Sequence, residues 1–327
     1  LITSDGSKEL FDVLGAFAER FAIPVVQFWR MAPAISTHSP MYAGESPRNL
    51  LAEADAVVVL DTIVPWMPGS MAIADDAVVI QIGSDPHFSG LPVRSFRSDI
   101  VITATPATAI AALHRGLDDE SLAETPATTV RRTSLERKLR ARRTQELSGA
   151  DGENATREGP MSPEFLSRTL SNAVGNDATI VNELGLATSM LDLTQHNSFF
   201  GPPTSAGLGW GGGAALGVKL AEPERLVVWA TGDGSYVFSN PAACHHAAAS
   251  LGLGLLTIVA DNRVWNAVRR ATIAVYPQGV AARTQTMPLT SLEPAPDYTK
   301  FVEAYGGYGE TVTRAEDLAP ALNRAIE

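Results

Sequence analysis

An apolar segment that ends in Gly-Asp-Gly-Ser constrains the fold of this chain more than any other feature. Residues 226–230 (LVVWA) have the composition of a buried parallel strand, and Gly232 to Ser235 follow almost at once. A second apolar segment, residues 255–260, ends just before Asn262. Because open α/β sheets bind ligands at the carboxyl ends of their strands, we expect Asp233 and Asn262 to lie at one such edge.

These two side chains offer hard oxygen ligands. Magnesium takes one or two carboxylates and completes its shell with phosphate oxygens and water. A carboxylate and an amide at the ends of neighbouring strands can therefore hold one Mg²⁺ against a diphosphate group.

The pattern GDG followed by Asn, with Asn262 29 positions after Asp233, resembles the motif of thiamine diphosphate (ThDP) enzymes. Residues 161–327 resemble the diphosphate-binding domain of the ThDP-dependent decarboxylase and acetolactate synthase family, nearest to benzoylformate decarboxylase. The resemblance rests on GLGWGGGAALGVKLAEPERLVVWATGDGS and VADNRVWNAVRR. Residues 1–120, with HSPMYAGES and IGSDP, resemble the central domain of the same family.

The resemblance implies a role for each matching residue. Asp233 and Asn262 ligate Mg²⁺ with their side chains, and the backbone carbonyl of Val264 adds a third oxygen. The diphosphate segment follows the strand: Gly232 permits the turn, and Gly234 and Ser235 bind the diphosphate. Glycine lets the backbone approach the ligand, and amides at a helix start favour anions.

Three further positions are implied on the cofactor side. Leu208 is the bulky apolar residue that forces the two rings of ThDP into a bent shape, and the backbone around Ala206 contacts the aminopyrimidine. Residues 182–185 (NELG) resemble a strand-end loop that also approaches the diphosphate. For His196 two roles stay open: a proton shuttle that faces the substrate, or an ordinary exposed or capping histidine.

Alternating strand-like and helix-like segments predict an α/β fold with two doubly wound parallel-sheet domains, a central Rossmann-like domain and a ThDP diphosphate-binding domain. We expect the central domain at residues 1–120, a linker at residues 121–160 and the diphosphate-binding domain at residues 161–327. The basic run at residues 131–143 is interpreted as a solvated helix between domains, with a patch for an acidic partner as the alternative.

Composition excludes several classes of function. The net charge of −11 argues against a nucleic-acid binder, and no apolar run reaches the roughly 18 residues that span a bilayer. The single cysteine, Cys244, excludes an internal disulfide and fits a reducing compartment. We therefore expect a cytoplasmic protein without membrane or nucleic-acid partners.

The resemblance implies ThDP- and Mg²⁺-dependent decarboxylation or carboligation of a small 2-oxo acid by a homodimer or homotetramer. The family's pyrimidine domain carries an activating glutamate. We expect that domain to be absent here, so that the chain is a fragment without activity alone. One alternative is a non-catalytic ThDP-binding or regulatory module. Another is an NAD- or FAD-dependent Rossmann enzyme. Residues 1–120 contain no G-x-G-x-x-G, and this absence argues against that alternative. FAD on the central domain stays possible but has no support in the sequence.

Overall fold

The chain forms two compact units in the computed structural model, which describes residues 1–4, 6–154, 160–205, 207–284 and 286–327. The first unit consists of residues 1–153 and 189–201, and the second of residues 154–188 and 202–327. This division differs from the expected one in two places. Residues 121–153 belong to the first unit, and so does the later segment 189–201.

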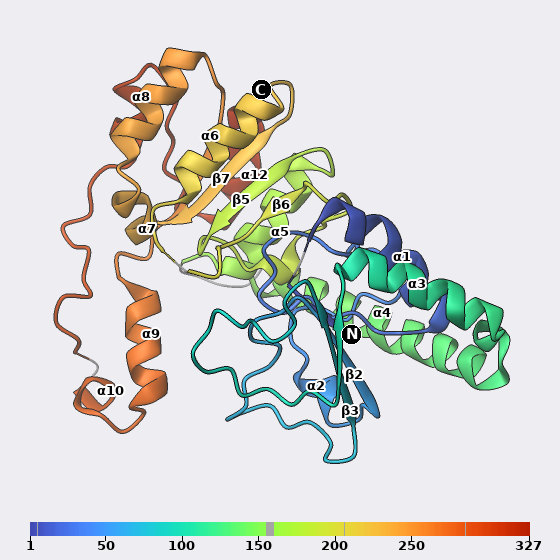
Figure 1. Cartoon of the computed structure of the whole chain (residues 1–327). Coiled ribbons are helices and arrows are strands. Elements are labelled where there is room, and N and C mark those ends of the chain that lie inside the picture. Colours follow the sequence, from blue (N-terminus) through green and yellow to red (C-terminus); the bar gives the residue numbers. More distant parts are fainter. Residues whose placement is uncertain (5, 155–159, 206, 285) are drawn as a thin grey trace. The chain divides into compact units, whose positions relative to one another are not determined.

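The first unit is built on a parallel sheet with the order β1-β2-β3-β4, in which β2 and β3 are labelled in Figure 1. Its strands are β1 (Ile2–Thr3), β2 (Ala56–Leu60), β3 (Val78–Gly83) and β4 (Ile100–Thr103). On the other side of β1, parallel bridges join Ile2 to Val26 and Val25 to Tyr42. The order of the chain thus reverses at β1, as in a doubly wound fold. Residues 23–28 have the apolar composition of a strand, but they form only these bridges, because β1 has only two residues with which they could pair.

Local sequence signals explain the helices on this sheet. The Ser7 side chain caps α1 (Lys8–Phe21) by accepting the Leu10 N–H at 3.3 Å, and Thr105 caps α3 (Pro106–Asp119). Leu10, Leu14 and Phe17 recur at helical spacing in α1 and are buried beneath it. Along β2, Val57 and Val59 pack into a second core on the other side of the sheet. Both faces are therefore covered, which confirms the predicted α/β class. The remaining short elements of this unit are α2 (Arg48–Leu51), η1 (Leu122–Glu124) and β6 (Phe199–Phe200).

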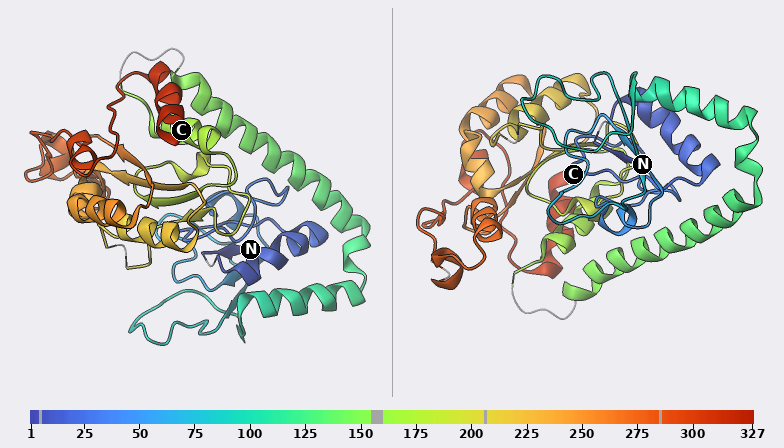
Figure 2. Two further views of the ribbon diagram at one scale, coloured as in Figure 1. Left: turned by 90° about the horizontal axis from the view of Figure 1, so that it is seen from above. Right: turned by 60° about the horizontal axis from the view of Figure 1, so that its bottom comes forward.

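The segment expected as a linker is mostly one uninterrupted helix, α4 (Pro126–Asn154), seen in both views of Figure 2. Leu139 is buried in the core that contains Val57 and Val59. Arg131 donates to the carbonyls of Phe21 and Ala22, and Arg132 to those of residues 19 and 20. The basic run is helical as interpreted, but its first two arginines cap the carboxyl end of α1 instead of being merely solvated.

The second unit contains a parallel arrangement in which β7 (Val227–Gly232) lies between β5 (Thr179–Glu183) and β8 (Leu256–Ala260). Ser162 caps α5 by accepting the Phe165 N–H at 3.2 Å. Between α11 and α12 the described residues form no strand, and Gly306 takes a positive φ of 82°. The short helix η2 (Thr188–Met190) lies where the chain passes from the second unit to the first. The other helical elements are α5 (Pro163–Val174), α6 (Gly211–Ala221), α7 (Asp233–Phe238), α8 (Pro241–Leu251), α9 (Asn266–Val275), α10 (Val280–Thr284), α11 (Thr299–Glu303) and α12 (Ala315–Ile326).

The buried indole of Trp229 on β7 explains the Gly-rich start of α6. A Cβ on Gly211 would lie 2.9 Å from Trp229 Nε1, and one on Gly212 would lie 2.9 Å from the same ring. Only glycine lets this helix pack so closely on β7. Among the described helices, none is long and apolar enough to cross a membrane.

We predict that Arg131→Ala combined with Arg132→Ala lowers the free energy of unfolding of the first unit by about 1–2 kcal/mol, because the last carbonyls of α1 lose charged donors. Chemical denaturation monitored by circular dichroism measures the change. Arg137→Ala with Arg140→Ala is the matched control, since both side chains are exposed on the same helix. Equal destabilisation by the two pairs would contradict the capping role.

Candidate metal and diphosphate site

The register of three strands brings the candidate residues to one edge of the second sheet. Glu183 at the end of β5 pairs with Thr231 of β7, and Gly232 pairs with Ala260 at the end of β8. Asp233 follows Gly232 directly and opens α7. The ends of all three strands therefore point to the same edge, where open α/β sheets take their ligands.

The Asp233 carboxylate is buried, with 2% of the residue exposed, and it joins two of these strand ends. Its Oδ1 accepts the Gly234 N–H at 2.8 Å, and its Oδ2 accepts the Arg263 N–H at 2.6 Å. Burial raises the pKa of Asp233, the two amides oppose the rise, and a hydrogen bond with the Asp261 carboxyl adds to it. A second carboxyl beside a buried one favours a cation at this position.

The loop after β8 carries the other two expected ligands. Asn262 is exposed, and its Oδ1 accepts the Val264 N–H at 3.0 Å. The Val264 carbonyl accepts the Asn266 N–H at 2.7 Å. Each of these oxygens keeps a second lone pair for a metal. No group of three or more His, Cys, Asp or Glu side chains that could hold a metal occurs among the described residues. A mixed set of carboxylate, amide and carbonyl oxygens fits the requirements of Mg²⁺.

The two glycines of the motif have different surroundings. Gly232 has φ −79° and ψ 158°, and a Cβ there would come no closer than 3.9 Å to the Leu184 carbonyl oxygen. The turn therefore does not require glycine at position 232, contrary to the expectation that this residue permits it. A Cβ on Gly234 would instead lie 2.6 Å from the ring of Trp265, so the surface of Gly234 is in contact with that indole.

A residue that the sequence analysis did not single out, Glu183, joins the remaining parts of the site. Its carboxylate is 1% exposed and accepts the N–H of Gly209 at 2.5 Å and of Gly211 at 2.7 Å. Burial raises the pKa of Glu183, and hydrogen bonds from the two amides and from the hydroxyl of Ser235, which is itself buried, oppose the rise. The sequence analysis named this residue only as part of the NELG loop at the end of an apolar strand.

Leu208 lies directly before Gly209 and is half-buried. Gly209 has φ +87°, and a Cβ there would lie 2.9 Å from the Phe238 carbonyl oxygen, so glycine is required for both reasons. The structure thus brings the Leu208 segment against the end of α7. Ala206, which the resemblance assigns to the aminopyrimidine, lies outside the described residues.

The NELG loop packs on the central strand. Asn182 Oδ1 accepts the N–H groups of Gly185 at 3.2 Å and Leu186 at 3.1 Å, forming a local turn. This turn holds Leu184 at a positive φ of 61°, an unfavourable conformation for leucine. A Cβ on Gly185 would lie 2.6 Å from the Thr231 nitrogen. The loop therefore lies directly against the strand that delivers Asp233.

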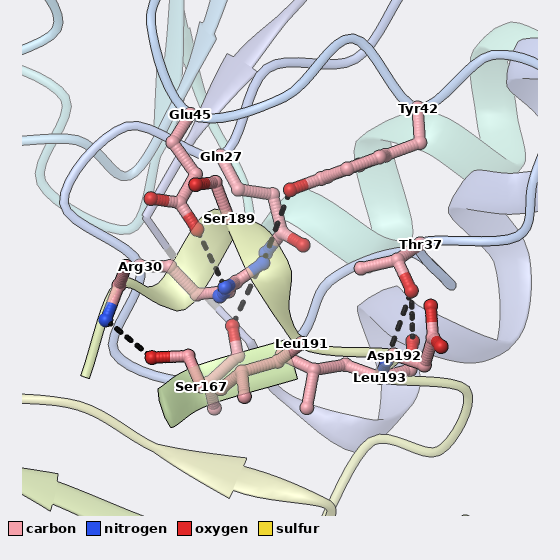
Figure 3. Close-up of polar contacts among 12 residues, drawn as sticks. Gln27, Arg30, Thr37, Tyr42, Glu45, Ser167, Ser189, Leu191, Asp192 and Leu193 are labelled. Atoms are coloured by element: carbon pink, nitrogen blue, oxygen red, sulfur yellow. Dashed lines mark hydrogen bonds and ion pairs between the residues drawn. The ribbon is translucent and has the colours of Figure 1, made fainter. Parts of the chain in front are cut away.

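His196 belongs to the first unit, in the segment 189–201, and its ring centroid is 6.3 Å from that of Phe11. Thr37 holds this segment by exchanging hydrogen bonds with the backbone of Leu193 (Figure 3). Arg143 donates to the Leu191 carbonyl at 2.9 Å. This ring contact indicates that His196 packs against Phe11. Its role as a proton shuttle stays a prediction.

The first unit has its own strand-end edge, where the order of the chain reverses. There Ser4 N–H donates to Thr62 Oγ1 at 3.0 Å and the Ser4 hydroxyl donates to the Asp61 carbonyl at 3.4 Å. The ends of β1 and β2 are thus bonded directly to each other. In the same unit, the buried Arg30 guanidinium donates to the Glu45 carboxylate at 2.6 Å and to the Tyr42 hydroxyl at 3.3 Å (Figure 3).

Comparison with known proteins points to one enzyme family. Residues 183–327 match the family described as thiamine pyrophosphate enzyme, C-terminal TPP binding domain. Acetolactate synthase large subunit IlvG from Mycobacterium tuberculosis is 30% identical over 174 residues, which cover 51% of this chain and 29% of that protein. Sulfoacetaldehyde acetyltransferase from Castellaniella defragrans is 24% identical over 340 residues, covering 95% of this chain and 54% of the relative.

The fold is also found in a solved structure. The thiamine diphosphate-dependent 4-hydroxybenzoylformate decarboxylase of Rhodococcus jostii RHA1 superposes with a TM-score of 0.75 at 20% identity, covering 100% of this chain and 58% of that one. The chain thus spans between 29% and 58% of the length of these three proteins. The family match and the similarity to acetolactate synthase confirm the resemblance found in the sequence: residues 183–327 match the C-terminal TPP binding domain of thiamine pyrophosphate enzymes.

Proposed function

We propose that the edge formed by β5, β7 and β8 binds ThDP through Mg²⁺. Asp233, Asn262 and the Val264 carbonyl supply the three protein oxygens. The observation that carries this proposal is the 2.6 Å hydrogen bond from the Arg263 N–H to Asp233 Oδ2, which holds the loop after β8 against the buried carboxylate. Asn262 and Val264 flank Arg263 on either side in the sequence, so both lie in the loop that this bond fixes.

The start of α7 serves the diphosphate. We keep the assignment that the resemblance implies: Gly234 lets the diphosphate approach the backbone, and the hydroxyl and N–H of Ser235 can donate to its oxygens. Leu208 directly precedes Gly209, whose N–H donates to Glu183, and its side chain supports the rings of the cofactor.

The reaction that we propose is decarboxylation or carboligation of a small 2-oxo acid, in a homodimer or homotetramer. When bound, ThDP supplies a thiazolium carbon that adds to the substrate carbonyl and accepts electrons as carbon dioxide leaves. The residues of this chain hold the metal, orient the diphosphate and support the rings. The names of the relatives, acetolactate synthase and 4-hydroxybenzoylformate decarboxylase, support this class of reaction.

We predict that ThDP binding requires Mg²⁺ and that Asp233→Asn weakens it by about 100-fold or more, because the metal loses its only carboxylate ligand in the proposed set. Isothermal titration calorimetry with and without a chelator measures both effects. Asp317→Asn, at an exposed carboxylate in the first turn of α12, is the control and should bind as the unaltered protein does. Equal affinity for the Asp233 variant would contradict the metal site.

Trp265 gives an optical signal for the same event. Its ring covers Gly234, so a diphosphate that reaches the start of α7 must change the surroundings of the indole. We predict that ThDP with Mg²⁺ changes the tryptophan emission and that Trp265→Phe removes most of this change. Trp66→Phe, which alters a buried indole of the first unit, should leave it intact. Retention of the full signal by Trp265→Phe would place the ligand elsewhere.

We also predict that the 327-residue chain binds ThDP without turning over 2-oxo acids. The resemblance places the glutamate that activates the aminopyrimidine on a pyrimidine domain of the family, and the residues assigned here only bind and orient. A decarboxylation assay with ThDP, Mg²⁺ and either pyruvate or benzoylformate tests this. Sustained turnover by the chain alone would refute it.

A further inference from the structure

The segment that carries Leu208 needs support from outside itself. Residues 207–213 read GLGWGGG, and glycine loses more conformational freedom on folding than any other residue. Such a segment cannot fix the position of a side chain through its own backbone preferences. Leu208 can support a cofactor only if another part of the protein holds the backbone on its carboxyl side.

Glu183 provides this support from a rigid position. It is the last residue of β5, whose five residues are all buried and paired in register with β7. One carboxylate oxygen accepts the N–H of Gly209 and the other accepts the N–H of Gly211. The two bonds flank Trp210 and fix the backbone immediately after Leu208.

The same carboxylate also reaches the other half of the site. The backbone that it holds packs on α7, since a Cβ on Gly209 would lie 2.9 Å from the carbonyl oxygen of Phe238, the last residue of that helix. The Ser235 hydroxyl, in the first turn of α7, opposes the rise in the pKa of Glu183. We propose that Glu183 is a positioning residue that sets the place of Leu208 relative to the start of α7, and hence the fit of the bound cofactor. This inference rests on the proposed ThDP site.

The donor set explains why a carboxylate is needed. The backbone N–H groups of Gly209 and Gly211 both donate to Glu183, and an ionised carboxylate is an acceptor at both oxygens. Glutamine has the same shape but places an NH₂ group against at least one of the backbone N–H groups. Removal of a single acceptor therefore leaves a buried donor without a partner and releases part of the glycine segment.

The reactivity of the Cys244 thiol can measure this loosening of the glycine segment in the absence of any cofactor. Cys244 is the only cysteine of the chain, and its sulfur lies 2.7 Å from the position of a Cβ on Gly212, so the start of α6 covers the thiol. Loosening of residues 209–212 should expose the thiol and speed its reaction with a disulfide reagent such as DTNB. The glycines of α6 thus make the thiol a local probe of the segment that Glu183 holds.

The test compares Glu183→Gln with Glu164→Gln, the same change at an exposed glutamate in the first turn of α5. Both are studied below the onset of unfolding measured by circular dichroism. We expect Glu183→Gln to weaken ThDP binding in the presence of Mg²⁺ by roughly 10-fold or more, as expected for loss of a charge-assisted hydrogen bond. We also expect faster labelling of Cys244 in the ligand-free protein. Glu183→Asp, which keeps the charge but shortens the reach, replaces Glu183→Gln if the latter does not fold.

Each outcome decides the proposal. Unchanged ThDP affinity in a folded Glu183 variant overturns it, and so does weaker affinity with unchanged labelling of Cys244, because Glu183 would then act by another route. Weaker affinity together with faster labelling supports it. If the unaltered protein fails to bind ThDP, the proposed function fails instead, while the labelling rates still show whether Glu183 holds the glycine segment.

Discussion

The parallel register of β5, β7 and β8 is the constraint on which the site depends. Thr231 and Gly232, at the end of β7, pair with Glu183 on one side and Ala260 on the other. A slip of one residue in either ladder would turn the strand-end side chain to the opposite face of the sheet. The register is fixed because Val227 to Ala230 of β7 are completely buried. Hydrophobic burial in the strand therefore sets the geometry of polar groups that lie beyond it.

Aromatic packing, and not only ligand contact, explains the glycines of this unit. Gly211 and Gly212 make room for Trp229, and Gly234 makes room for Trp265. In each case a Cβ would lie within 3 Å of an indole, closer than side chains pack. Of the two motif glycines, Gly234 thus has a structural reason, whereas Gly232 has none of this kind. A bound diphosphate would share the surface of Gly234 with Trp265, which makes that indole part of the site.

Local sequence signals predicted much of this fold, and they failed where distant contacts decide. The helical spacing of Leu10 and Leu14 and the apolar run before Asp233 are both visible within a short window. A helix was predicted at residues 131–143, but its packing on the first unit was missed, because that packing comes from Leu139 and from arginines that contact α1, more than a hundred residues earlier in the sequence. The role of Glu183 was missed for the same reason, since its donors lie 26 and 28 residues away.

Two buried carboxylates end neighbouring strands, and their surroundings separate their roles. Glu183 accepts hydrogen bonds from two backbone amides, which stabilise its negative charge within the protein. Asp233 accepts two amides but also faces the Asp261 carboxyl, which adds negative charge instead of balancing it. A divalent cation relieves that repulsion at Asp233, whereas at Glu183 it would have to displace bonds that hold the fold. A carboxylate therefore holds the neighbouring backbone in place at one strand end and favours metal binding at the next.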